Sequence, residues 1–271
     1  MRSLLIVRRR SLAVLLALCL AASAAPSSAD VWDNDPNNED DSSGTDNELF
    51  HGDVQVHDLE SDPGVAADQD WFAIRSRPFS SYEVLVSGMQ GEIWGSTNAS
   101  VDRVDGTGVV LTAGAPPPGG QNSSQSVRWA NNTGSQSIDY IRVDGTTADC
   151  NVFCSANSQY TIRMRETTGA ISRFNNAGSQ TTVLILQNPT DYAIAGTVYF
   201  WDSSGTQAGS QPFLLQPKAL SVISTPTIVP GIAGSITITQ NGRFGDLQGK
   251  SIALEPSTGF SFDTPMTYRP Q

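Results

Sequence analysis

The sequence predicts an all-β protein: two tandem antiparallel β-sandwiches, the first jelly-roll-like and the second immunoglobulin-like, after a cleaved signal peptide. Apolar and polar residues alternate with a period of two in short segments such as 160–165, the pattern of a half-buried strand. Turn residues interrupt the chain about every 8–12 residues, the spacing of a sandwich. No long apolar stripe of helical period follows the first 29 residues, so we expect little or no helix beyond the signal peptide.

The first 29 residues have the order of a secretory signal peptide: basic residues, then an apolar run, then small residues. Arg2 and the arginines at 8–10 precede an apolar run at 12–20, and small residues follow at 21–29. The apolar run is too short to span a bilayer. We expect cleavage after Ala29, with Ala24 and Ala25 as alternatives, and therefore a secreted or extracellular protein, or a periplasmic one, without a membrane span.

The exported chain is strongly acidic. Removing residues 1–29 takes away four arginines and no acid, which changes the formal net charge from −11 to −15. A polyanion of this kind repels nucleic acid and anionic lipid, so neither is expected as a partner. Residues 30–66 are predicted to be an acidic leader and the start of the first domain. Residues 30–46 have almost no apolar side chain beyond Val31 and Trp32 with which to bury themselves, so we expect a solvated, flexible leader there.

Short strands are predicted from residue 67 onward. A first domain covers 67–166 and includes the hairpin signal Asp105-Gly106 and a Pro-rich loop at 113–125. The pattern breaks at 166–169, which we take as the domain boundary. A second sandwich covers 167–271, and its segment 183–186 is apolar on both faces, as expected of a central strand.

The first block resembles the bacterial pre-peptidase C-terminal domain, a small β-sandwich attached to many exported enzymes. Four pieces carry the likeness over residues 30–166: the acidic start at 33–35, the Asp-Gln-Asp-Trp-Phe segment at 68–72, the strand and hairpin at 101–106, and the closing strand at 159–162. The Pro-rich loop and the cysteine pair depart from the family pattern. The second block looks like C-terminal β-sandwich domains of unknown function in exported bacterial proteins, and the likeness rests on residues 173–176, 198–201, 249–256 and 259–265.

The resemblance implies a calcium site, because some members of that family bind calcium through acidic residues near the domain start. Its counterparts here are Asp33, Asp35, Asp68 and Asp70. Clustered carboxylates suit Ca²⁺, which takes six to eight oxygen ligands. A calcium ion is the one cofactor that these residues suggest, and the alternative for Asp70 is that it caps a turn before Trp71.

Two cysteines, Cys150 and Cys154, remain after signal cleavage. An even number of cysteines in an exported chain predicts a disulfide. The loop that this disulfide would close is short, so its expected contribution to stability is modest.

No arrangement typical of an enzyme occurs in the sequence. The two histidines, His51 and His57, lie in the acidic zone, where we expect solvated side chains; the alternative is a transition-metal site that they form with Asp53 or Asp58. No nucleophile elbow, zinc-protease motif or phosphate loop is present. The leading hypothesis is therefore an exported, non-enzymatic module for structure, adhesion or recognition, with an unknown extracellular protein or polysaccharide as its partner.

Two alternatives stay open. Paired carboxylates can make a glycoside hydrolase, and the candidates for such a pair are Glu83, Glu92, Asp102 and Asp105. Tryptophans can bind polysaccharide if they are exposed, and the candidates are Trp94, Trp129 and Trp201. The periodic placement of Trp129 and Phe200 favours the core for most of them.

Overall fold

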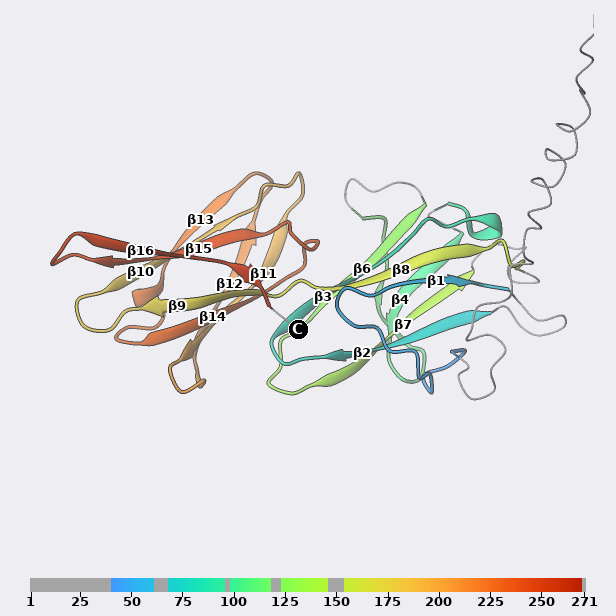
Figure 1. Cartoon of the computed structure of the whole chain (residues 1–271), viewed down its shortest axis with the longest axis horizontal. Helices are drawn as coiled ribbons and strands as arrows, with labels where there is room; N and C mark the ends of the chain where they lie inside the picture. Colours follow the sequence, from blue (N-terminus) through green and yellow to red (C-terminus); the bar gives the residue numbers. More distant parts are fainter. Residues whose placement is uncertain (1–39, 61–67, 96–97, 118–122, 146–153, 270–271) are drawn as a thin grey trace, which may run out of the picture.

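The computed structural model describes residues 40–60, 68–95, 98–117, 123–145 and 154–269, so the predicted signal peptide lies outside the described residues. Within these ranges the chain is all-β, and its two short helical segments are the 3₁₀ turns η1 (Gly91–Ile93) and η2 (Thr225–Thr227). No helix in the described part is long and apolar enough to cross a membrane. Two sandwiches lie end to end along the long axis of the molecule (Figure 1).

The first sandwich is a jelly roll of eight antiparallel strands. Its strands are β1 (Val54–Asp58), β2 (Gln69–Ser76), β3 (Ser80–Ser87), β4 (Ala99–Val104), β5 (Val110–Ala113), β6 (Ser124–Asn131), β7 (Ser137–Gly145) and β8 (Gln159–Glu166). Strand β1 pairs with β8, β2 with β7, β3 with β6, and β4 with β5. The result is two facing sheets of order β1-β8-β3-β6 and β2-β7-β4-β5, as predicted.

The second sandwich packs a four-stranded sheet on a five-stranded one. Its strands are β9 (Gly169–Asn175), β10 (Thr181–Gln187), β11 (Ile194–Asp202), β12 (Gln207–Leu215), β13 (Leu220–Ser224), β14 (Ala233–Gln240), β15 (Gln248–Glu255), β16 (Phe260–Pro265) and β17 (Thr267–Tyr268). The sheets have the orders β13-β10-β15-β16 and β12-β11-β14-β9-β17. This is the predicted two-sheet antiparallel construction, with four and five strands instead of the four and three of an immunoglobulin constant domain.

Each sandwich has its own hydrophobic core, produced by the alternation that the sequence shows. In β8 the side chains of Tyr160, Ile162 and Met164 are at most 3% exposed. Those residues join a cluster that runs from Leu49 to Met164, and a separate cluster begins at Ile171. Alternate residues of each strand therefore fill the space between two sheets, as expected for sandwich packing.

The prediction of a solvated acidic segment at residues 40–46 is wrong for Asp40 and Thr45, which are 2% and 8% exposed. The segment runs along the open edge of β2. The carbonyl of Asp40 accepts a hydrogen bond from the Trp71 amide at 2.6 Å, and the Leu49 amide donates to the carbonyl of Ala73 at 2.9 Å. Pairing with an edge strand satisfies backbone groups that a polar segment could not bury alone.

The connection between the sandwiches is buried and hydrogen-bonded. Thr167 and Thr168 are fully buried, and the Thr167 amide donates to the carbonyl of Ser81 at 2.7 Å. The Ser81 amide in turn donates to Oγ1 of Thr168 at 2.9 Å, and Oγ of Ser81 accepts from the amide of Gln240 in β14. The link between β8 and β9 is therefore part of the packed structure.

Aromatic contacts extend this junction. The ring of Phe79 lies 4.8 Å from that of Tyr199 and 4.9 Å from that of Trp201, both on the outer face of β11. The side-chain oxygen of Asn132 accepts hydrogen bonds from the hydroxyl groups of Tyr199 and Thr239, each at 3.0 Å. The loops of the first sandwich thus rest on one face of the second and fix their relative orientation.

Candidate functional site

A cluster of three titratable side chains lies at one end of the first sandwich. Asp40 belongs to the segment along β2, His57 to β1 in one sheet, and Asp70 to β2 in the other. Each offers a ligand atom within 4.8 Å of the others, and the side chains are 2%, 2% and 0% exposed. Three chain segments therefore meet at one buried polar point.

The surroundings of the cluster are aromatic and hold its side chains in place. The imidazole of His57 stacks on Tyr160 at 5.8 Å and meets Phe72 edge-on at 4.8 Å, and its Nε2 is 2.9 Å from Oε1 of Gln55. The hydroxyl of Tyr160 donates a hydrogen bond to Oδ2 of Asp70. This contact joins the two facing sheets.

One further polar side chain reaches the cluster. The amide of Asn47, itself 1% exposed, donates to Oδ2 of Asp40 at 3.4 Å, and its Oδ1 accepts no hydrogen bond from the described residues. The Nδ1 of His57 lies 4.0 Å from the same carboxylate oxygen. Burying two carboxylates so close together is unfavourable unless their charge is compensated.

The cluster contains ligand types that divalent cations accept. Carboxylate and amide oxygens, from Asp40, Asp70 and Asn47, are ligands that calcium accepts. The imidazole nitrogen of His57 is a ligand that zinc and other transition ions prefer. A cation at this point would neutralise buried charge and tie together the three segments that supply the ligands.

The sequence predicted part of this cluster. Asp70 is in it, whereas Asp33 and Asp35 lie outside the described residues, and Asp68 is half-buried beside β2. Asp40 was missed. His57 was considered as a metal ligand only with His51 and Asp53 or Asp58, and the expectation of a solvated His57 is wrong. Asp40 and His57 precede Asp70 by 30 and 13 residues, so no local motif contains all three. The jelly-roll pairing, which no local pattern reveals, brings them together.

The second histidine lies in a cleft of about 350 Å³ at the junction, lined by Glu48, Leu49, Phe50, His51, Arg75, Arg77, Tyr82, Gln136, Met164 and Glu166. The Nδ1 of His51 accepts the backbone amide of Glu166 at 2.9 Å. Burial and the nearby Arg165 guanidinium lower the pKa of His51 below its usual value. The fully buried Glu166 carboxylate pairs with Arg77 and, at 3.5 Å, with Arg269.

The carboxylates considered for glycoside hydrolysis have separate local partners. Glu83 accepts the Phe244 amide at 3.1 Å, and Asp102 accepts the Gly114 amide at 3.3 Å. Hydrogen bonds from Ser158 and Ser155 lower the pKa of Glu92, and those within its own turn lower that of Asp105. A glycosidase acid needs a raised pKa, so the shifts of Glu92 and Asp105 run against that role.

The three tryptophans considered for sugar binding do not share a surface. Trp129 is 5% exposed and stacks on Tyr82 in the first core, and Trp201 packs against Phe79 at the junction. Trp94, just after η1, is 68% exposed. The prediction that most of these tryptophans belong to the core is confirmed for Trp129, and Trp94 is the exposed member of the set.

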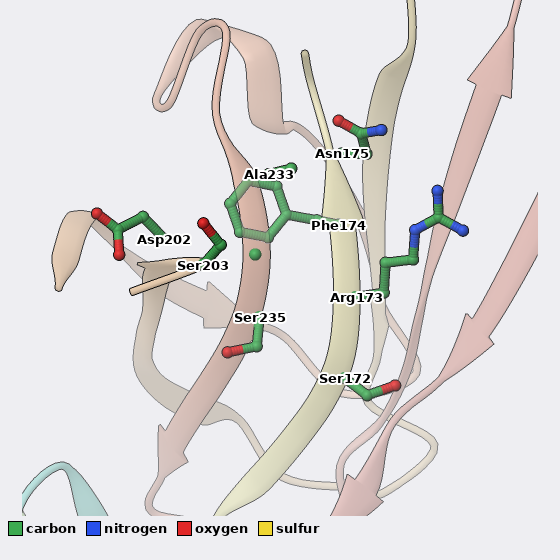
Figure 2. Close-up of a pocket in the computed structure, with 9 residues that line it drawn as sticks. Ser172, Arg173, Phe174, Asn175, Asp202, Ser203, Ala233 and Ser235 are labelled. Carbon is green, nitrogen blue, oxygen red and sulfur yellow. The ribbon is translucent and has the colours of Figure 1, made fainter. Parts of the chain in front are cut away.

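A second hollow, of about 460 Å³, opens on the second sandwich (Figure 2). Figure 2 shows Asp202 and Ser203 on one side of Phe174 and Arg173 on the other. Hydrogen bonds from Ser204 and Thr206 lower the pKa of the exposed Asp202, whose carboxylate closes its own turn. The hollow therefore holds a structured turn and no converging acid–base pair among its lining residues.

The predicted disulfide falls partly outside the described residues. Cys154 is 1% exposed and belongs to the first core, while Cys150 lies outside the described ranges. The pairing of Cys150 with Cys154 stays a prediction.

Comparisons with known proteins give no family. No protein-family model matches the sequence, and no curated protein matches it. Among solved structures, a glycosyl hydrolase family 2 member from Bacteroides cellulosilyticus is 8% identical with a TM-score of 0.22, and the match covers 76% of this chain and 31% of that one. A β-glucuronidase from glycoside hydrolase family 2 is 10% identical with a TM-score of 0.19 over 77% of this chain and 25% of that one. The chain spans less than a third of the length of either.

Proposed function

We propose that this chain is an exported, non-enzymatic structural or recognition module whose first sandwich binds a divalent cation at Asp40, His57 and Asp70. The buried convergence of these three side chains carries the proposal. A cation held there would join the segment along β2 to both sheets, and the packed junction would pass that stiffness to the second sandwich. The proposed activity is mechanical: the chain presents its surfaces at a fixed separation.

Calcium is the first candidate ion and zinc the second. The carboxylates of Asp40 and Asp70, with the Asn47 amide oxygen turned toward the ion, would hold calcium. The nearby His57 nitrogen favours zinc, because an imidazole is a poor ligand for calcium and a good one for transition ions. Substitution of His57 separates the two, because only zinc binding needs its nitrogen.

Thermal unfolding of the chain purified after export tests the proposal, with calcium, with zinc and with chelator. An ion at a hundred times its dissociation constant adds about 2.7 kcal/mol of stability. This increment raises the midpoint by several degrees. We expect Asp70→Asn to abolish the ion-dependent rise, and Asp105→Asn, which changes an exposed carboxylate of the same sandwich, to keep it.

For each variant, the unfolding midpoint with ion is compared with the midpoint without ion, so that any effect of the substitution on the stability of the apoprotein cancels. His57→Gln is expected to keep a calcium response and to lose a zinc response. If neither ion moves the midpoint of the unaltered chain, or if Asp70→Asn responds as fully as Asp105→Asn, the cation proposal is wrong.

Polysaccharide binding is a second candidate, supported by the exposure of Trp94. Its indole, 68% exposed after the 3₁₀ turn η1, can stack on a sugar ring. Affinity electrophoresis through gels that contain soluble polysaccharides tests this role. Retardation that Trp94→Ala removes and Phe260→Ala leaves intact would support it, because Phe260 is an equally exposed aromatic residue of the second sandwich.

A further inference from the structure

The outer face of the sheet β13-β10-β15-β16 carries a group of apolar side chains among polar ones. In β10, the side chains of Thr182, Leu184 and Leu186 are fully buried against the core. Because side chains alternate along a strand, Val183 and Ile185 point to the opposite face. A solvated outer face normally carries polar residues at such positions.

The strand register gathers more apolar side chains around these two. Val222 of β13 lies opposite Ile185, and Ile252 of β15 lies opposite Val183. Leu220 and Val222 are 56% and 59% exposed, and Leu254 is 40% exposed. We define the apolar face as Val183, Ile185, Leu220, Val222, Ile252 and Leu254.

The charges of this face cancel. Among the outward-pointing residues of the four strands, all within the described ranges, the charged ones are Lys250 and Asp263. They pair with each other at 2.6 Å between Nζ and Oδ2. The face is therefore neutral in a chain whose formal net charge is −11.

The opposite side of the second sandwich is already in use. Tyr199 and Trp201, on the outer face of the five-stranded sheet, contact Phe79 of the first sandwich. The apolar face belongs to the other sheet, so a molecule docked on it would leave the junction intact.

We infer that the apolar face binds a second copy of this chain, sheet against sheet. A two-fold interface needs a patch that complements itself, and a flat, neutral, apolar sheet face does so. Elsewhere two strongly acidic molecules repel each other, and contact through the neutral face avoids that cost. The two faces would pack about 10 Å apart, as in a β-sandwich.

The size of the face sets the expected strength. Four strands about 4.8 Å apart and about six residues long cover roughly 400 Å² of projected area per copy. Two stacked copies would bury on the order of 1,000 Å² of accessible surface, the lower limit for a specific interface. The dimer is therefore expected to be reversible and dependent on concentration.

Sedimentation velocity of the chain purified after export, over a hundredfold range of concentration, tests the inference. We expect the mass to rise from monomer to dimer. Val222→Lys should weaken the dimer at least about tenfold, because it buries an unpaired charge within the contact. The matched control is Leu214→Lys on β12, which changes a 62% exposed leucine of the other sheet and should leave dimerisation unchanged.

Two further measurements keep the test decisive. Val222→Thr preserves the β-branched shape and is expected to weaken the dimer less than lysine does, and circular dichroism checks that each variant is folded. A chain that stays monomeric over the whole range, whatever else binds to it, overturns the inference. So does a Val222→Lys variant that dimerises as well as Leu214→Lys.

Discussion

Arg269, close to the end of the chain, places its Nε 3.5 Å from Oε1 of Glu166, the last residue of β8. The same guanidinium donates to the carbonyl of Phe79 and to Oγ of Ser80, each at 2.8 Å. The C-terminal residue of the described chain therefore fastens the second sandwich to the strand that closes the first.

Because this contact is buried, we expect replacement of Arg269 to lower the unfolding free energy more than replacement of Lys250, which forms an exposed ion pair. Arg269→Met leaves the fully buried Glu166 with Arg77 as its remaining cation, and we expect a loss of about 2 kcal/mol of unfolding free energy. Lys250→Met breaks an exposed pair with Asp263 and should cost less than about 1 kcal/mol. Urea unfolding measures both, and equal losses would contradict a structural role for the buried pair.

His51 predicts a loss of stability in mild acid. Its pKa is lowered in the folded state, first by burial, so the unfolded chain takes up a proton at higher pH than the folded chain. The stability linked to His51 is present above pH 6.5 and falls as the pH drops below that value. His51→Asn keeps an acceptor for the Glu166 amide and removes the titration. Its unfolding free energy should fall less between pH 7 and pH 5.5 than that of the unaltered chain.

Tyr192 and Tyr268 are expected to ionise only at very high pH. Burial is the main cause that raises the pKa of Tyr192 and Tyr268 to about 12, and Tyr192 also donates a hydrogen bond to Asp246. Because both groups are neutral in the fold, their contribution to stability is present below pH 10 and is lost as the pH rises toward 12. Tyrosinate absorbance, recorded within seconds of a pH jump and plotted against pH, should rise in a step near pH 12. Tyr192→Phe and Tyr268→Phe should each reduce the height of that step.

We expect the ring of Phe79 to hold the two sandwiches in a fixed relative orientation. Phe79→Ala removes the ring that touches Tyr199 and Trp201, and we expect a loss of about 2 kcal/mol together with a broader distribution of interdomain distances. Phe260→Ala, at a 66% exposed phenylalanine, is the control. Small-angle scattering and thermal unfolding check both variants. An unchanged scattering profile for Phe79→Ala would mean that the ring is dispensable for orientation.

The architecture could be predicted because it depends on local patterns. The alternation at 160–165 became β8, and Asp105-Gly106 connects β4 to β5 as the hairpin signal indicated. The convergence of Asp40, His57 and Asp70 could not be predicted, because they come from two sheets and from a segment that pairs with the edge of β2. The apolar composition of residues 183–186 likewise predicted a central strand. The exposure of Val222 could not be predicted in this way, because it depends on the pairing of β13 with β10, which turns Val222 to the outer face of the sheet.

The pairing of β1 with β8 has a consequence for how the protein is made. Val54 lies opposite Arg163, so the outer strand of the first sheet cannot find its partner until about a hundred further residues have been synthesised. In the second sandwich, β17 likewise returns to pair with β9. Folds dominated by such distant contacts form slowly. Each sandwich closes with its own last strands, so a chain interrupted before these segments emerge keeps unpaired strand edges and is exposed to aggregation.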